Sequence, residues 1–297
     1  MPSKNIEKTT ANELIQPSQF NTQMVAGFGA ESAQAIHAEI VKMTQAEFKS
    51  AIVSKQFSVR LQMVVELKTR RLVGFESLIR WKHPIFGALR PIFFLKPLIA
   101  AGLSQKITEY MLARAARFQV HAIAARKTIV PIYVNISGAQ FQHENLYEII
   151  LGVINRYNLP AGAIAVEMTE TDLVVDIVAA ASVIRKLREI GVDVLADDFG
   201  HAFASIRNLL DYDYNGFKLD RSFITSLDNN PKSAIVVAHL AHLAKKLNMT
   251  MTAEGIETEQ QAASIAELGV QQGQGYLFGK PMSRLTALAL LPDADAG

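Results

Sequence analysis

The amino-acid sequence predicts an α/β fold whose eight strands close into a barrel. From about residue 57, short runs rich in β-branched residues alternate with amphipathic stretches, a pattern typical of βα units. Eight strand candidates follow one another in one series, which favours a barrel over an open sheet. An open doubly wound sheet is the alternative. It would need a Gly-rich phosphate-binding turn after its first strand, and the sequence has none there.

The individual elements follow from hydrophobic spacing and turn residues. Helices are predicted at 180–190, where Gly191 follows, and at 233–248, each with an apolar stripe at helical spacing. Between the first two strands, residues 68–71 suit a tight hairpin turn and leave no room for a helix, so we expect this pair to be antiparallel. The strand candidates are 58–67, 71–81, 128–137, 163–170, 192–198, 216–220, 249–255 and 270–276.

Composition excludes several classes of protein. The 297 residues are 49% hydrophobic, which is enough to bury one large core, and the net charge of +2 gives no electrostatic footprint for a nucleic-acid polymer or an anionic membrane. The chain has no cysteine, which excludes disulfides and thiolate zinc sites and suits the cytoplasm. Because no apolar run is long enough to span a bilayer, we expect a cytoplasmic protein without a membrane span.

The first part of the chain differs from the rest. Residues 1–43 are polar, with a weakly helical patch at 30–43, whereas 44–297 carry the strand and helix series. We interpret 1–43 as an arm or linker with a short helix, reaching toward an upstream regulatory domain or a partner protein. A regulatory helix is the less favoured interpretation.

Acidic and amide residues fall at the ends of the predicted strands. Side chains at the carboxyl ends of barrel strands meet at one mouth, where barrel enzymes carry their catalytic residues. So many carboxylates at one mouth require compensating positive charge, and oxygen ligands suit Mg²⁺, Mn²⁺ or Ca²⁺ better than zinc. These residues are Glu76, Asn135, Glu167, Glu170, Asp197, Asp198, Lys218, Asp220, Glu254, Glu257 and Gln274.

The adjacent pair Asp197–Asp198 is the most informative of these features. Consecutive strand residues face opposite sides, so both can point into the mouth only where the strand ends and the chain turns at Gly200. Two cations about 3.5–4 Å apart are a standard arrangement for cleaving phosphate esters, and Lys218 beside them could orient a water. Taken singly, each carboxylate has an alternative role as a solvated strand end or helix N-cap, and Lys218 as a surface lysine.

Seven ordered motifs resemble one family. The stretch from about 44 to 290 contains "FESLIRWKHP", "VNIS", "VEMTE", "DDFG", "FKLDRSFI", "AEGIE" and "QGYLFGKP", and together these resemble the EAL domain, the cyclic di-GMP phosphodiesterase family. The resemblance implies a modified TIM (β/α)₈ barrel with an antiparallel first strand. It also implies hydrolysis of cyclic di-GMP to linear pGpG with two Mg²⁺ or Mn²⁺ ions, Ca²⁺ as an inhibitor, and a homodimer formed through the barrel.

The resemblance also implies roles for particular residues. Glu76, Asn135, Glu167 and Asp197 would hold one metal, and Asp197, Asp198 and Glu254 the other. Lys218 and Gln274 would act on the catalytic water, so that Glu76, Lys218, Glu254 and Gln274 are the expected catalytic residues. Gln62, Arg80, Gln274 and, more weakly, Asp220 would bind the substrate. Glu170 and Glu257 would contact the metal-binding residues without binding the metals themselves, and Glu170 would hold the loop after the fifth strand.

The sequence departs from the family pattern in three places. Ser77 occupies the middle of the signature triplet, and Met63 stands where proline is usual. After "DDFG" the family continues with Thr-Gly-Tyr, and this chain has His201, Ala202 and Phe203. In the family that loop couples the dimer interface to the metals, so we expect reduced or differently regulated activity. A silent cyclic di-GMP receptor, or a barrel enzyme acting on another phosphate compound, is the alternative.

Overall fold

A computed structural model describes residues 30–169, 174–200, 206–227 and 229–294. Its contacts divide the chain into two compact units, Met1–Ser58 with Ile79–Ile107, and Val59–Leu78 with Thr108–Gly297. Strands β1 (Phe57–Glu66) and β2 (Leu72–His83) run through both units. In the part of the chain that is described, no helix is long and apolar enough to cross a membrane.

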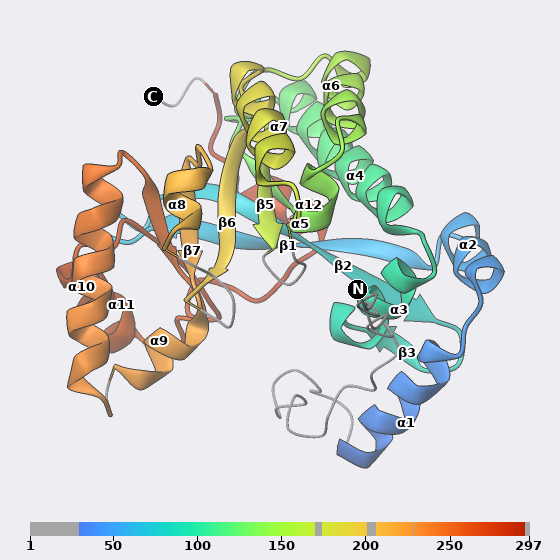
Figure 1. Ribbon diagram of the computed structural model, residues 1–297, viewed down its shortest axis with the longest axis horizontal. Helices are drawn as coiled ribbons and strands as arrows, with labels where there is room; N and C mark the ends of the chain where they lie inside the picture. The colour runs from blue at the N-terminus through green and yellow to red at the C-terminus, as the bar shows by residue number, and fades with distance from the viewer. Residues whose placement is uncertain (1–29, 170–173, 201–205, 228, 295–297) are drawn as a thin grey trace, which may run out of the picture. The chain divides into compact units, whose positions relative to one another are not determined.

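The second unit contains the barrel (Figure 1). Its order is β1-β9-β8-β7-β6-β5-β4-β2, and pairing of β1 with β2 closes it. Strand β1 pairs antiparallel with β9, whereas successive pairs from β2 and β4 through to β9 are parallel. The predicted fold class and its antiparallel first strand are therefore confirmed. The later strands are β4 (Ile132–Ser137), β5 (Ile164–Thr169), β6 (Asp193–Phe199), β7 (Gly216–Leu219), β8 (Thr250–Ala253) and β9 (Gln272–Gln274).

Helices connect the parallel strands and pack on their outer surface. Helix α7 (Ile177–Glu189) contacts β6, and α10 (Pro231–Lys246) contacts β8, so both predicted helices form. The short helices α5 (Gly138–Phe141), α8 (Asn208–Asp211) and α9 (Arg221–Ser226) follow the carboxyl ends of β4, β6 and β7. The remaining helices of this unit are α4 (Ser104–Ala124), which begins in the first unit, α6 (Asn145–Tyr157), α11 (Glu259–Glu267) and α12 (Arg284–Leu290).

The barrel interior changes from apolar to polar along its axis. Val64, Tyr133, Ala165 and Leu195 form one buried apolar layer. Because strand residues alternate, Asn135 and Glu167 face the same interior two residues beyond Tyr133 and Ala165, toward the carboxyl ends. The apolar layer therefore lies beneath the polar side chains in the barrel interior.

The first unit has its own aromatic core. Trp81 packs on Phe57 with ring centroids 5.2 Å apart and contacts Phe48 and Phe94. Strand β3 (Gly87–Leu89), which the sequence did not predict, pairs antiparallel with the end of β2. The helical patch of the N-terminal segment is α1 (Ala30–Val41), whose apolar face packs on α3 (Pro91–Ala100). Helix α2 (Gln45–Val53) follows, and the function of residues 1–43 stays a prediction.

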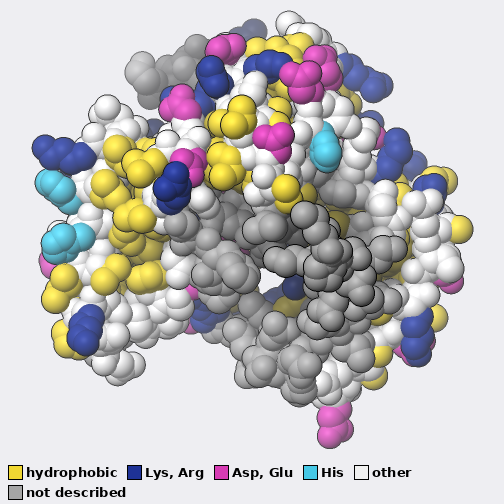
Figure 2. All heavy atoms as spheres, viewed as in Figure 1, with side chains coloured by type: hydrophobic (Ala, Val, Ile, Leu, Met, Phe, Trp, Pro, Cys, Tyr) yellow, Lys and Arg dark blue, Asp and Glu magenta, His cyan; other side chains and the backbone are white. Residues whose placement is uncertain are grey.

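Charge on the surface is mixed. On the face drawn in Figure 2, basic and acidic side chains are interspersed over the described helices, without a field of one sign. This distribution agrees with the net charge of +2.

The close approach of β7 to β8 at Gly216 can be tested by substitution. A Cβ atom on Gly216 would lie 2.3 Å from the Thr250 carbonyl oxygen, so Gly216→Ala should lower the free energy of unfolding by about 1–3 kcal/mol. Gly152 in α6 is exposed and has nothing within 4 Å of an added Cβ, so Gly152→Ala should instead raise it by about 0.5–1 kcal/mol. Urea denaturation measures both, and equal stability of the two variants would contradict this packing.

Candidate active site

A buried lysine lies at the centre of the barrel mouth. The Lys218 Nζ atom is 2.5 Å from Glu254 Oε1, 3.2 Å from Glu167 Oε2 and 3.4 Å from both Glu76 Oε2 and Asp197 Oδ1. Burial alone would lower the pKa of Lys218, but the surrounding carboxylates outweigh burial and hold that pKa well above its usual value. Lys218 therefore stays charged, and the interpretation as a surface lysine is wrong.

The alternation of side chains along β7 explains which way Lys218 points. All four residues of the strand are buried, and alternation points Gly216 and Lys218 inward while Phe217 and Leu219 point toward the outer layer. The Phe217 ring packs on Phe199 with centroids 4.7 Å apart. These apolar contacts fix the strand, so the lysine side chain extends along the barrel interior to the carboxylates.

Besides Lys218, two side-chain amides bind the carboxylate of Glu76. Asn135 Nδ2 donates to Glu76 Oε1 over 2.7 Å, and Gln274 Nε2 donates to Glu76 Oε2 over 2.5 Å. Gln274 Nε2 also lies 3.3 Å from Gln62 Oε1. Burial would raise the pKa of Glu76, but Lys218 and the amide donors outweigh it, and this pKa lies below its usual value. Glu76 is therefore a fixed negative charge.

The other carboxylates have the opposite shift. Burial, followed by repulsion from Asp197, raises the pKa of Asp198 to about 7. For Glu254, burial and repulsion from Asp197 and Glu76 outweigh the attraction of Lys218 and raise the pKa to about 8. The pKa values of Glu167 and Asp197 are also raised, chiefly by burial. Among the described residues, the mouth thus contains five carboxyl groups and one ammonium group, which is too little positive charge to balance them.

A bulge in β6 directs both adjacent aspartates into the mouth. The register with β7 shifts between Ala196 and Phe199, which leaves one extra residue on β6. Asp198 lies in the left-handed region with φ of 51°, and Gly200 follows with φ of 93°. The predicted turn at Gly200 is present. The bulge, which lies before Phe199, allows the consecutive side chains of Asp197 and Asp198 to point into the same site.

These groups fit a pair of hard divalent cations. Asn135 Oδ1, Asp197 Oδ1 and Gln274 Oε1 are buried without a hydrogen-bond partner in the described structure, although Asp197 Oδ1 lies 3.4 Å from Lys218 Nζ. Asp197, Asp198 and Glu254 can each place a carboxylate oxygen within 4.8 Å of the others. Unpartnered oxygen atoms together with an excess of carboxylates are the donor set that Mg²⁺ and Mn²⁺ prefer.

Several predicted residues lie outside this cluster. Asp220 Oδ1 accepts a hydrogen bond from Ser222 N and thereby caps α9, and Glu257 pairs with Arg221 over 3.1 Å. Arg80 belongs to the first unit, where its Nη1 donates to the Ile79 carbonyl oxygen. Glu170 and the loop variant at 201–203 lie outside the described residues.

One contact of the mouth was missed from the sequence. Gln62 Nε2 lies 3.3 Å from the carbonyl oxygen of Gly279 and can donate to it, which orients Gln62 toward Gln274. The position of Gly279 in "QGYLFGKP" is a signal for an irregular backbone, but the sequence does not show which side chain that backbone contacts.

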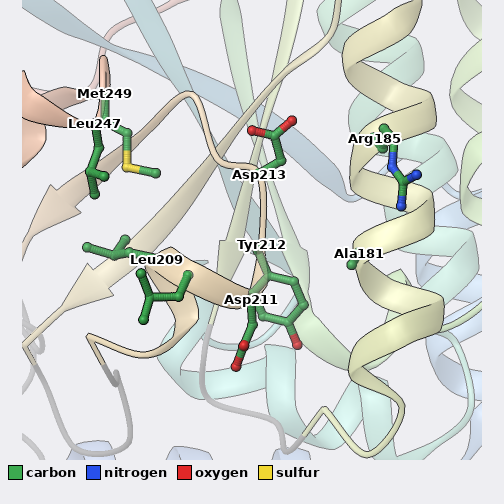
Figure 3. Close-up of a pocket in the computed structure, with 9 residues that line it drawn as sticks. Ala181, Arg185, Leu209, Asp211, Tyr212, Asp213, Leu247 and Met249 are labelled. Atoms are coloured by element: carbon green, nitrogen blue, oxygen red, sulfur yellow. The ribbon is translucent and has the colours of Figure 1, made fainter.

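A separate pocket of about 320 Å³ lies on the flank of the barrel unit, between α7 and the segment from α8 to Asp213 (Figure 3). It is lined by Ala181, Arg185, Leu209, Leu210, Asp211, Tyr212, Asp213, Leu247 and Met249. None of the carboxylates around Lys218 lines it, so it is distinct from the mouth.

Comparisons with known proteins agree with this geometry. Residues 45–281 match the family model described as the EAL domain. A cyclic di-GMP phosphodiesterase of Pseudomonas aeruginosa is 31% identical over 226 residues, 76% of this chain and 38% of that protein. The cyclic di-GMP phosphodiesterase RocR of the same organism is 29% identical over 76% of this chain and 58% of its own length. The chain thus spans less than two thirds of these relatives.

Solved structures give the same result. A structure described as the PaMucR phosphodiesterase in a c-di-GMP complex has a TM-score of 0.76 and 30% sequence identity to this chain. The match covers 82% of this chain and 98% of that one, so it includes nearly the whole of the solved domain.

The raised pKa values predict an unusual dependence of stability on pH. A carboxyl group whose pKa is higher in the folded chain than in the unfolded one takes up a proton on folding, so falling pH favours the folded state. For Asp198, whose pKa is about 7 against an ordinary value near 4, stability is lost as the pH rises through about 7.

Metal-free protein should therefore gain stability between pH 8 and 5.5, and the gain should be smaller by about 1–3 kcal/mol in Asp198→Asn. Urea denaturation in EDTA measures it, with Asp293→Asn, an exposed aspartate, as the control. If the free energy of unfolding changed with pH in the same way in the wild type and in Asp198→Asn, the pKa of Asp198 would not be raised on folding.

Proposed function

Because the chain belongs to the EAL domain family, we propose that it hydrolyses cyclic di-GMP to linear pGpG with two divalent cations, Mg²⁺ or Mn²⁺. The observation that carries the proposal is the convergence of four carboxylates on one buried lysine at the barrel mouth, with Asn135 bonded to Glu76 and Asp198 grouped with Asp197 and Glu254. The relatives named above, at about 30% identity, are cyclic di-GMP phosphodiesterases, which supports the choice of substrate.

The proposed ligand sets are those that the resemblance to the EAL domain implies, and the grouping of Asp197, Asp198 and Glu254 supports the second of them. Glu76, Asn135, Glu167 and Asp197 would hold one ion, and Asp197, Asp198 and Glu254 the other, with Asp197 shared. Divalent cations bound there supply Lewis acidity that neutralises charge on phosphoryl oxygens and acidifies a water.

Lys218 and Gln274 would complete the catalytic set. Because its pKa is held well above the usual value, Lys218 keeps its proton, so it would act as a hydrogen-bond donor and fixed positive charge and not as a base. The Nε2 atom of Gln274 donates hydrogen bonds to Glu76 and Gln62, while its Oε1 atom has no hydrogen-bond partner among the described groups. That oxygen is therefore suited to accept a hydrogen bond from the attacking water and so orient it.

Substrate binding is assigned to Gln62, Gln274 and Arg80. The planar guanidinium of Arg80 suits a phosphate or a guanine edge, because both accept two parallel hydrogen bonds. Asp220 caps α9 through Oδ1, so a contact with guanine would add to its structural role. We further propose a homodimer formed through the barrel, inhibition by Ca²⁺, a cytoplasmic location and regulation by an upstream domain or partner.

A catalytically silent receptor is the second candidate, favoured by the His201-Ala202-Phe203 sequence in the loop after "DDFG". A chain that only binds the nucleotide has no need for its metal ligands, and all six predicted ligands are present in this sequence. Their retention supports the enzyme over the receptor.

The product assay separates the enzyme from other possibilities. Incubation with cyclic di-GMP and Mn²⁺ should give pGpG, and Glu76→Ala should reduce the rate by at least about 100-fold because it removes a ligand held by Lys218, Asn135 and Gln274. Glu267→Ala, at an exposed position of α11, is the control and should keep the full rate. Chromatography of the nucleotides measures both. Nucleotide binding with no pGpG would reject the proposal.

The loop substitution tests the receptor directly. Replacing His201, Ala202 and Phe203 with Thr-Gly-Tyr should change the rate by less than about tenfold, or about 1.4 kcal/mol of barrier, if the natural loop is a tuned variant. Steady-state kinetics with cyclic di-GMP measures this change. A rise from undetectable to robust turnover would instead identify the natural chain as a silent receptor.

A further inference from the structure

The turn that follows β8, residues Glu254–Glu257, carries one carboxylate of the mouth. Glu254 N donates to the Leu219 carbonyl oxygen over 3.2 Å, which is the last backbone bond between β7 and this segment before the chain turns. Beyond that bond, the direction of the Glu254 side chain depends on the backbone of the turn. Whatever holds the turn therefore also holds one member of the carboxylate cluster.

Gly255 gives the turn its shape and brings it against Arg221. Gly255 has φ of 73°, a conformation that residues with a side chain rarely adopt. A Cβ atom there would lie 2.5 Å from Arg221 Cγ and 2.9 Å from both Cβ and Cδ. The aliphatic stem of Arg221 thus lies directly on the glycine backbone, in the space that a side chain would otherwise fill.

The head of Arg221 holds the far end of the same turn. Its Nη2 atom is 3.1 Å from Glu257 Oε1, with both side chains about a third exposed at 37%. A pair this exposed contributes little to the stability of the fold. Its geometric effect is larger, because one side chain spans the turn from Gly255 to Glu257.

The opposite side of the turn is held by backbone. Ile256 N donates to the Gln274 carbonyl oxygen, and Leu277 N donates to the Ile256 carbonyl oxygen, both over 3.1 Å. Gly275 lies so close that an added Cβ would meet the Ile256 backbone. The turn is therefore clamped between Arg221 on one side and the segment after β9 on the other.

Strand β7 and the residues just after it contact both ends of this arrangement. Lys218 Nζ is 2.5 Å from Glu254 Oε1, and Arg221, three residues later, covers the glycine that follows Glu254. We propose that Arg221 is a positioning residue for Glu254, which it holds in the cluster with Asp197 and Asp198 by fixing the turn. The catalytic consequence rests on the proposed function, whereas the effect on the turn does not.

The first test needs neither metal nor activity. In Arg221→Ala, amide hydrogen exchange of Ile256 and Leu277 in EDTA should become at least about tenfold faster, equivalent to about 1.4 kcal/mol of lost local protection. Lys186→Ala, which removes the exposed Lys186–Glu144 pair elsewhere in the unit, should leave these amides unchanged. Unchanged exchange in Arg221→Ala would overturn the proposal.

The second test measures the coupling to Glu254. Mn²⁺ titration followed by electron paramagnetic resonance should show about 10–100-fold weaker binding of one ion in Arg221→Ala, and Arg221→Lys, which keeps the stem and the charge, should recover most of it. In kinetics, kcat at fixed Mn²⁺ should fall while KM for cyclic di-GMP stays nearly constant. Faster exchange with unchanged Mn²⁺ affinity would overturn the link to Glu254.

These outcomes separate this inference from the proposed function. If the wild type binds Mn²⁺ and Arg221→Ala weakens that binding, but no pGpG is formed, the positioning role stands and the hydrolysis fails. If pGpG is formed and Arg221→Ala matches the wild type in exchange, Mn²⁺ affinity and kcat, the hydrolysis stands and the positioning role fails.

Discussion

The attraction between one buried ammonium and several carboxylates is the interaction on which the rest of this barrel mouth depends. Lys218 reaches Glu76 on β2, Glu167 on β5, Asp197 on β6 and Glu254 just after β8. Because a single positive charge cannot balance them, most of these acids have raised pKa values and Glu76 alone is stabilised in its charged form. The closed strand order makes the convergence possible, and a buried apolar layer lies below it in the barrel.

Much of this arrangement could be predicted from sequence, for an identifiable reason. Strand ends are local features, and a barrel brings them to one rim, so Glu76, Asn135 and Glu167 could be assigned to one mouth before their distances were known. The hairpin at 68–71 fixed the direction of the first strand in the same way. Family motifs then assigned roles that spacing alone leaves open.

What could not be predicted depends on contacts between distant segments. The charge of the buried Lys218 is balanced by four carboxylates from other segments of the barrel, so no local pattern distinguishes it from a surface lysine. The bulge at Asp198 places a non-glycine residue at positive φ, against its own preference. Strand β3 forms because three residues meet the end of β2, too short a run to be recognised. The capping bond of Asp220 likewise required the start of α9 to be known.

The raised pKa values have a further consequence for how metal ions would fill this site. At neutral pH Asp198 and Glu254, with pKa values of about 7 and 8, are partly protonated, and a cation that binds them must displace those protons. In the proposed two-metal site, hydrogen ions and metals would therefore compete for the same oxygens. Occupancy would then respond to acidity and to metal supply together, and a slightly alkaline interior would load the site at a lower concentration of free metal.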